Sequence, residues 1–137
     1  MPAESDTRLV DAAEQNHLAT VDTLLEADVD VNTPQVDGMT TLHWAVYHDN
    51  LALTRRLVVA GALAQATSRY GVTPVSLACQ NGSGKIVRLL LESGEDSGTR
   101  MRGGETALMI AARTGKVEPI DALLAHRADV NATEARG

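Results

Sequence analysis

The sequence predicts an all-α fold, a solenoid in which short helix-turn-helix units stack in a row. Three observations lead to this fold class. Residues of the same type recur every 33 positions, each recurrence holds a glycine turn followed by two short apolar segments, and large aromatic residues are scarce. A fixed period of about 20 to 50 residues indicates supersecondary units that bury their apolar faces against one another.

Four sets of identical residues share this period. Each set has four members, and successive members lie 33 residues apart. Four independent columns in one register are not expected by chance, so we take the period as a property of the fold. The columns are Gly38, Gly71, Gly104 and Gly137; Thr7, Thr40, Thr73 and Thr106; Ala12, Ala45, Ala78 and Ala111; and Leu24, Leu57, Leu90 and Leu123.

The composition fits thin layers of helix. The 137 residues include no phenylalanine, one tryptophan and two tyrosines. A core without large aromatic side chains must pack small aliphatic residues closely, which suits layers of short helices better than a β-sandwich or barrel. The formal net charge of −6 is opposite to the basic balance of phosphate-binding surfaces, so we expect no nucleic-acid partner.

The sequence of each unit predicts a turn followed by two helices. A glycine turn such as Asp37-Gly38 leads to a threonine that can cap the following helix. A second helix with leucine pairs ends near a glycine such as Gly61, which suits a left-handed C-cap. Helices of about eight to ten residues are marginal alone, so each unit must stack on a neighbour. The breaks between the two helices are expected at Asn16, Asp49, Gly82 and Gly115.

Two recurring motifs resemble the ankyrin repeat family. One is the family's Thr-Pro-Leu-His followed by alanine, and the other is its closing Asp-Val-Asn. The resemblance covers nearly the whole chain and implies an ankyrin solenoid with short β-turn or hairpin loops. It also makes His43 a structural histidine that bonds to the backbone of a neighbouring turn. The matching segments are residues 40–45, 73–78, 106–111, 29–32 and 128–131.

The period divides residues 1–137 as a single ankyrin-repeat domain. The first unit lacks the opening turn and reads as an N-terminal cap. The last helix pair carries Ile120, Leu123 and Leu124 without the polar cap that usually ends a repeat array. We therefore expect a segment of a longer repeat protein, or a chain that covers this face by self-association. The units are approximately 1–32, 33–65, 66–98 and 99–131, with a truncated fifth starting at 132–137.

The resemblance also implies a binding surface, because ankyrin repeats bind through turn tips and the exposed side of the first helix. All three aromatic residues of the chain fall on such positions, and aromatic residues and arginine are enriched at binding hot spots. The expected partner-binding residues are Val36, Asp37, Met39, Trp44, Tyr47 and His48; Arg69, Tyr70, Val72, Leu77, Gln80 and Asn81; and Arg102, Gly103, Glu105, Ile110, Arg113 and Thr114.

Two features of this surface have alternative interpretations. Trp44 shares a column with Asp11, Leu77 and Ile110 that is often half-buried between units in this fold, so packing and binding are equal alternatives for it. For Tyr47 and Tyr70, binding is the favoured interpretation. A locally basic row suggests an acidic partner, although exposed charges usually only interact with solvent. The row consists of Arg69, Arg102 and Arg113.

Catalytic and metal chemistry finds no support in the sequence. Residues 82–85, Gly-Ser-Gly-Lys, lack the earlier glycine and the following Ser or Thr of a phosphate-binding loop, which leaves an inter-helix turn. Cys79 occupies a packed alanine column, where a buried thiol is inert. We expect no enzyme activity, no cofactor and no metal, because the histidines show no ligand spacing. These are His17, His43, His48 and His126.

The predicted function is a protein-protein interaction module that binds a peptide or protein through its concave groove and turn tips. The alternative is a structural or regulatory repeat segment that positions another domain or self-associates through its C-terminal face. No apolar run approaches the roughly 20 residues that span a bilayer, so no membrane insertion is expected. We expect a soluble protein, cytoplasmic by default, or an exported bacterial protein whose signal peptide has been removed.

Overall fold

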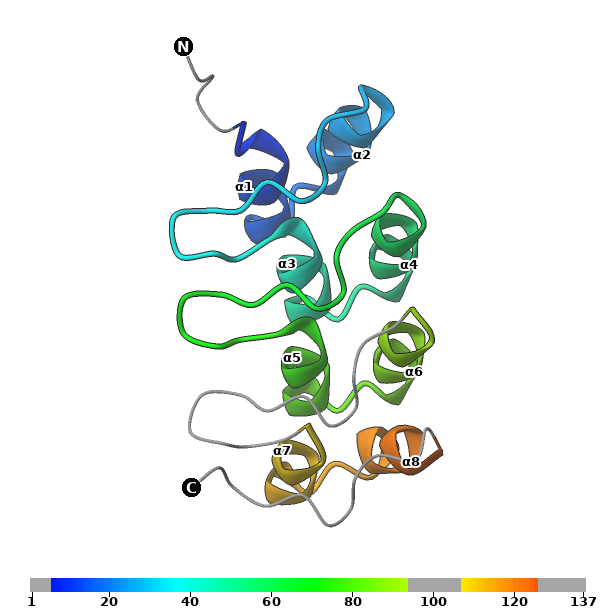
Figure 1. Cartoon of the computed structure of the whole chain (residues 1–137). Coiled ribbons are helices and arrows are strands. Elements are labelled where there is room, and N and C mark those ends of the chain that lie inside the picture. Colours follow the sequence, from blue (N-terminus) through cyan, green and yellow to red (C-terminus); the bar gives the residue numbers. More distant parts are fainter. Residues whose placement is uncertain (1–5, 94–106, 126–137) are drawn as a thin grey trace.

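The computed structural model describes residues 6–93 and 107–125, and there the chain forms consecutive helix pairs, here called units one to four (Figure 1). Successive pairs stack in order, so the predicted all-α fold of stacked helix-turn-helix units is confirmed. The pairs are α1 (Arg8–Glu14) with α2 (Leu18–Glu26), α3 (Thr41–Tyr47) with α4 (Leu51–Val59), α5 (Pro74–Asn81) with α6 (Gly84–Glu92), and α7 (Ala107–Thr114) with α8 (Val117–Ala125).

The helices form two rows (Figure 1). The first helices pack against one another as α1 on α3, α3 on α5 and α5 on α7, while α6 packs against α4 and α8 in the other row. Figure 1 shows the loops that precede α3 and α5 projecting past the row of first helices. None of the described helices has the length and apolar character needed to cross a membrane.

Side-chain caps fix where α3, α4, α5 and α6 begin. Thr40 and Thr73 accept hydrogen bonds from the backbone N–H groups of His43 and Ser76, at 3.4 and 3.2 Å, as the threonine column predicts. The side chains of His43 and Ser76 bond back to the threonine N–H, which completes a capping box at α3 and at α5. The second helices have caps that we did not predict. These are Asn50 for α4 and Ser83 for α6.

The predicted breaks between paired helices are confirmed by the backbone. Asn16 and Asp49 have φ values of 59° and 57°, and Gly82 and Gly115 have 82° and 73°. This left-handed region favours glycine, and asparagine and aspartate adopt it more readily than other residues. Gly61, which follows α4, also has a positive φ of 99°, in agreement with its expected C-cap role.

Glycine also allows two close approaches between units. Gly38 has a φ of 89°, and a Cβ there would lie 3.0 Å from the Cα of Ser68. A Cβ on Gly84 would lie 2.8 Å from the Cβ of Glu118, so this glycine lets α6 approach α8. Gly82 and Ser83 thus form the turn between α5 and α6 that the sequence suggested, and Gly84 and Lys85 begin α6.

The loops that carry Gly38 and Gly71 are tight hairpin turns, here called the first finger (residues 33–40) and the second finger (residues 66–73). The Gln35 N–H donates to the Met39 carbonyl at 2.9 Å, and the Ser68 N–H donates to the Val72 carbonyl at 2.9 Å. The Arg69 N–H donates to the Asp37 carbonyl at 2.7 Å. This last bond joins the two fingers, so their tips form a continuous edge.

Candidate binding surface

Three rings of unit two gather at the C-terminal end of α3. The Trp44 and Tyr47 rings meet edge to face, with centroids 5.2 Å apart at 81°, and Tyr47 meets His48 at 5.2 Å and 79°. Edge-to-face contacts of this kind are favourable beyond the area they bury. Tyr47 is nevertheless 53% exposed. We call Trp44, Tyr47 and His48 the aromatic cluster.

Gln35 of the first finger holds the aromatic cluster against unit one. The Trp44 Nε1–H donates to Gln35 Oε1 at 2.9 Å. The Gln35 amide nitrogen in turn donates to Asp11 Oδ1 at 3.0 Å and to Glu14 Oε1 at 2.7 Å. Trp44 is half-buried and its polar edge is already satisfied, so its orientation is fixed before any partner arrives.

A hollow of about 380 Å³ lies beside this network. Asp11 accepts from the Thr7 hydroxyl at 3.0 Å and Asp37 from the Met39 N–H at 3.1 Å. The described lining of the hollow contains three carboxylates and no lysine or arginine. The hydrogen-bond donors are neutral, so they hold the carboxylates without cancelling their charge. We call it the acidic hollow. Its lining is Thr7, Asp11, Glu14, Gln35, Val36 and Asp37.

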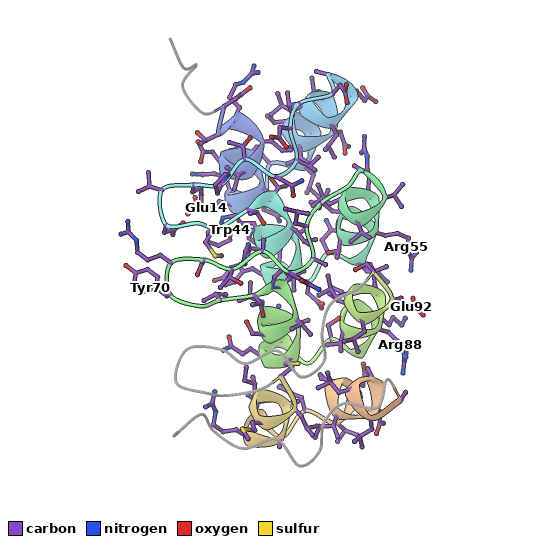
Figure 2. All side chains as sticks on the ribbon, in the orientation of Figure 1. Glu14, Trp44, Arg55, Tyr70, Arg88 and Glu92 are labelled. Carbon is purple, nitrogen blue, oxygen red and sulfur yellow. The ribbon has the colours of Figure 1, made fainter. Side chains whose placement is uncertain are left out.

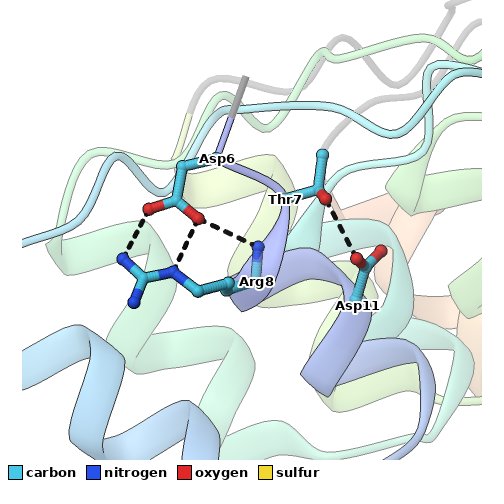
Figure 3. A network of polar contacts seen from close by, with 4 residues as sticks. All are labelled: Asp6, Thr7, Arg8 and Asp11. Atoms are coloured by element: carbon cyan, nitrogen blue, oxygen red, sulfur yellow. Dashed lines mark hydrogen bonds and ion pairs between the residues drawn. The ribbon is translucent and has the colours of Figure 1, made fainter. Parts of the chain in front are cut away.

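Arg8, the arginine nearest along the chain to the acidic hollow, pairs with a carboxylate outside the hollow. Arg8 pairs with Asp6, with 2.7 Å between Nη2 and Oδ2 (Figure 3). Hydrogen bonds from Arg8 lower the pKa of Asp6 to about 2. Figure 3 shows Asp11 bonded to Thr7 instead. Arg8 therefore pairs with Asp6 and does not neutralise the carboxylates of the acidic hollow.

Two predicted binding residues have structural contacts. The His48 Nε2 lies 3.0 Å from the Glu14 carbonyl oxygen of unit one. One period later, the Asn81 amide donates to the carbonyls of Val46 and Tyr47 at 2.8 and 3.1 Å. Both side chains therefore cap the end of the preceding first helix. Thr114, in the same column, bonds to the Ala111 carbonyl of its own helix.

The remaining predicted residues divide by exposure. Val36 and Tyr70 are 93% and 57% exposed at the finger tips. Ile110 is 0% exposed and belongs to the hydrophobic core, which corrects its expected place on the surface. Its aliphatic side chain has no polar edge to reach solvent, and α7 packs against both α5 and α8. Arg69, Gln80 and Arg113 are exposed, and Met39, Val72 and Leu77 are half-buried.

Several predictions fall outside the described residues. These include Arg102, Gly103 and Glu105, so the expected basic row is only partly described. The expected cap Thr106, His126 and the expected fifth unit at 132–137 also lie outside.

Figure 2 shows how the labelled side chains are distributed. Among these residues, the charged side chain near the first finger is acidic, whereas the second-helix side has two arginines and one glutamate. Glu14 and Trp44 lie beside the first finger and Tyr70 lies at the second finger, whereas Arg55, Arg88 and Glu92 lie along the second helices on the opposite side.

Sequence reasoning missed three residues of this surface, Asp11, Glu14 and Gln35. A usable signal was present for two of them. Asp11 and Glu14 lie one period before Trp44 and Tyr47, the positions already assigned to binding. Gln35 had no comparable signal, because its equivalent in the second finger is the small residue Ser68.

His43 and Cys79 have the structural roles that the sequence predicted. Both side chains are 0% exposed. The His43 Nε2–H donates to the Val72 carbonyl at 2.8 Å, so Nδ1 is the acceptor for the Thr40 N–H at 3.0 Å. Burial lowers the pKa of His43 and raises the pKa of Cys79 to about 12. Within the described residues, no three His, Cys, Asp or Glu side chains are arranged to hold a metal ion.

Comparison with known proteins agrees with this architecture. Residues 9–101 and 68–134 match the family described as "Ankyrin repeats (3 copies)". The chain is 35% identical to the B-cell lymphoma 3 protein homolog of Mus musculus and 34% identical to the B-cell lymphoma 3 protein of Homo sapiens, over 97% of its own length in each case. These alignments cover 32% and 31% of the two relatives, so the chain spans about a third of their length.

A fungal relative shares the repeats within a much larger protein. The ankyrin repeat domain-containing protein SAT10 of Stachybotrys chartarum is 30% identical over 85% of this chain and 6% of its own length. Ankyrin repeat domains are generally protein-interaction modules and typically non-enzymatic. The family match and the relatives cover most of the sequence, and the chain belongs to the ankyrin repeat family.

Proposed function

We propose that this chain binds a peptide or protein surface through the concave side formed by its first helices and finger tips. The observation that carries the proposal is the exposure of both tyrosines of the chain on that side, Tyr47 at 53% and Tyr70 at 57%. Val36, on the first finger, is 93% exposed. Single exposed apolar residues are ordinary, but Tyr47 belongs to a cluster of three rings, and exposed aromatic residues are enriched at binding hot spots.

The packing around these residues also supports binding. Gln35 fixes the Trp44 ring through its N–H, and His48 joins the cluster to the Glu14 carbonyl. The bond between the Arg69 N–H and the Asp37 carbonyl holds the two finger tips together. Side chains that are ordered before association lose little conformational entropy when a partner binds, so more of the contact energy appears as affinity.

Random peptides displayed on phage provide a direct test. Peptides selected on the folded chain would be measured against the double variant Tyr47→Ala/Tyr70→Ala. The matched control is Val59→Ala/Leu63→Ala, which also removes two exposed apolar side chains, at 82% and 61% exposure, away from the first helices. Unfolding by urea would be measured for each variant, because Tyr47 also packs against Trp44.

We expect the tyrosine variant to weaken peptide binding by about tenfold or more, the effect of losing a hot-spot residue. The control should bind as the parent does. Equal loss in both double variants, or loss only in the control, would overturn the assignment to this side of the molecule.

A second candidate function rests on the outer face of unit four. Val117 and Leu124 of α8 are 65% and 47% exposed, whereas Leu91, the counterpart of Leu124 in unit three, is 7% exposed and covered. Such a face can carry a further repeat or a second copy of the chain, which is the structural role expected from sequence. Sedimentation equilibrium with Leu124→Glu as control tests this, since a concentration-independent monomer mass for the parent chain would exclude self-association.

A further inference from the structure

We infer that the surface formed by α1, the first finger and the aromatic cluster receives an extended segment of the partner whose arginine enters the acidic hollow. This inference rests on the proposed function and adds the chemical class of the partner. Tyr47 and Val36 provide the apolar part of the surface, at 53% and 93% exposure. The acidic hollow provides the charge that selects the segment.

The negative charge of this surface has no counter-ion among the described side chains. Asp11, Glu14 and Asp37 each accept hydrogen bonds, but the donors are a hydroxyl, an amide and a backbone N–H. These donors position the carboxylates and leave their charge uncancelled. A cation from a partner would therefore meet three carboxylates that are already oriented, and such complementary charge favours its encounter and register.

Arginine fits the geometry better than lysine. The carboxylates of Asp11 and Glu14 both bond to the same Gln35 amide nitrogen, which holds them close together. A planar guanidinium can donate to two neighbouring carboxylates at once and can also stack on aromatic rings, whereas an ammonium group is a compact, strongly hydrated charge. The hollow of about 380 Å³ has room for a side chain, and the aromatic cluster adjoins it through Gln35 and Glu14.

The opposite side of the molecule would discourage the same segment. A smaller hollow of about 230 Å³ between α4 and α6 is lined by Arg55, Lys85 and Arg88, with Glu92 as its acidic residue. Figure 2 shows Arg55 and Arg88 on the side away from Glu14 and Trp44. Of these two hollows, the acidic one therefore attracts a basic segment, whereas the one lined by Arg55, Lys85 and Arg88 repels it.

The test uses the peptides selected on phage and a pair of charge variants. Asp11→Asn/Glu14→Gln removes two carboxylates but keeps side-chain oxygens that can accept from Gln35 and Thr7. The matched control, Glu92→Gln/Asp121→Asn, removes two exposed carboxylates from the second-helix side. Each peptide would be measured with its arginine and with glutamine or lysine in that place. Fluorescence of Trp44, the single tryptophan, reports binding at the site.

We expect arginine next to an apolar residue to be enriched in the selected peptides. Asp11→Asn/Glu14→Gln should weaken their binding about tenfold, while the control should change it less than about twofold. Replacing the peptide arginine with glutamine should weaken binding to the parent chain and have little further effect on Asp11→Asn/Glu14→Gln. That non-additivity is the signature of a direct contact.

The possible failures separate the two proposals. Peptides that depend on Tyr47 and Tyr70 but carry no basic residue would overturn the arginine inference and leave the proposed function standing. A selection that yields no binder would overturn both. If the lysine peptide binds as tightly as the arginine peptide, the choice of arginine is wrong. If the two charge variants lose the same affinity, the overall charge of the chain explains the effect and the acidic hollow does not.

Discussion

The joint between units one and two can be compared with the joint between units two and three. At the first joint, exposed carboxylates of Asp11 and Glu14 accept bonds from Gln35, and His48 contacts the Glu14 carbonyl. At the second joint, the 0% exposed His43 reaches the Val72 carbonyl, and Asn81 donates to the carbonyls that end α3. The first joint is charged and open to solvent, whereas the second is neutral and its key histidine is buried.

The proposed function assigns binding to the first joint, and the buried hydrogen bonds assign stability to the second. A buried hydrogen bond is costly to break because its partners are left without water, whereas exposed polar contacts contribute little to the free energy of folding. The second joint therefore has the contacts that hold the solenoid together. The first joint has oriented charges that a partner can use without much cost to the fold.

The largest expected effect is that of His43→Ala. It removes a buried side chain, leaves the Thr40 N–H without its acceptor and removes one of the two hydrogen bonds to the Val72 carbonyl, which still accepts from the Ser68 N–H. We expect the free energy of unfolding to fall by about 2–4 kcal/mol, measured by urea denaturation. Ser76→Ala is the matched control, since within the described part of the chain the Ser76 hydroxyl bonds to Thr73 of its own capping box. Its expected cost is about 1 kcal/mol. Equal costs would show that the bond to Val72 contributes nothing.

A smaller effect is expected at the position shared by His48 and Asn81. Asn81→Ala should cost about 1 kcal/mol, because its amide satisfies two carbonyls at the end of α3. His48→Ala should cost less, because its contact with the Glu14 carbonyl is exposed and water can replace it. Urea denaturation of both variants measures the comparison directly. A larger cost for His48→Ala would reverse the assignment of stability to the second joint.

The smallest expected effect is a pH dependence near neutrality. Burial lowers the pKa of His43, while the Val72 carbonyl and the charge of Asp37 offset part of that shift. The unfolded chain therefore binds this proton more readily than the folded chain, and the free energy of unfolding should fall as pH drops through about 6.5. Unfolding curves at about pH 7.5 and about pH 6 measure this fall around the ordinary histidine pKa. In His43→Ala the free energy of unfolding should fall less between these two pH values. If the fall is as large as in the parent chain, groups other than His43 cause it.

Much of the fold could be predicted because it depends on local chemistry repeated at a fixed period. Thr40 and Thr73 cap their helices, and Asn16, Asp49, Gly82 and Gly115 break them, since each role requires only a residue type and its neighbours. The candidate surface was predicted less completely. Ile110 proved buried and Gln35 was overlooked, because exposure and cross-unit bonds depend on what packs against a residue.

The sequence by itself determined the period, the helix boundaries near caps and breaks, and the family. These follow from backbone conformational preferences and from apolar faces that must be covered. Only the tertiary structure decided that His48 and Asn81 cap helices of the preceding unit, and that Asp11, Glu14 and Asp37 meet in one hollow. The physical reason is that stacking brings together residues about one repeat apart, and the resulting contacts depend on side-chain length and direction rather than on the column a residue occupies.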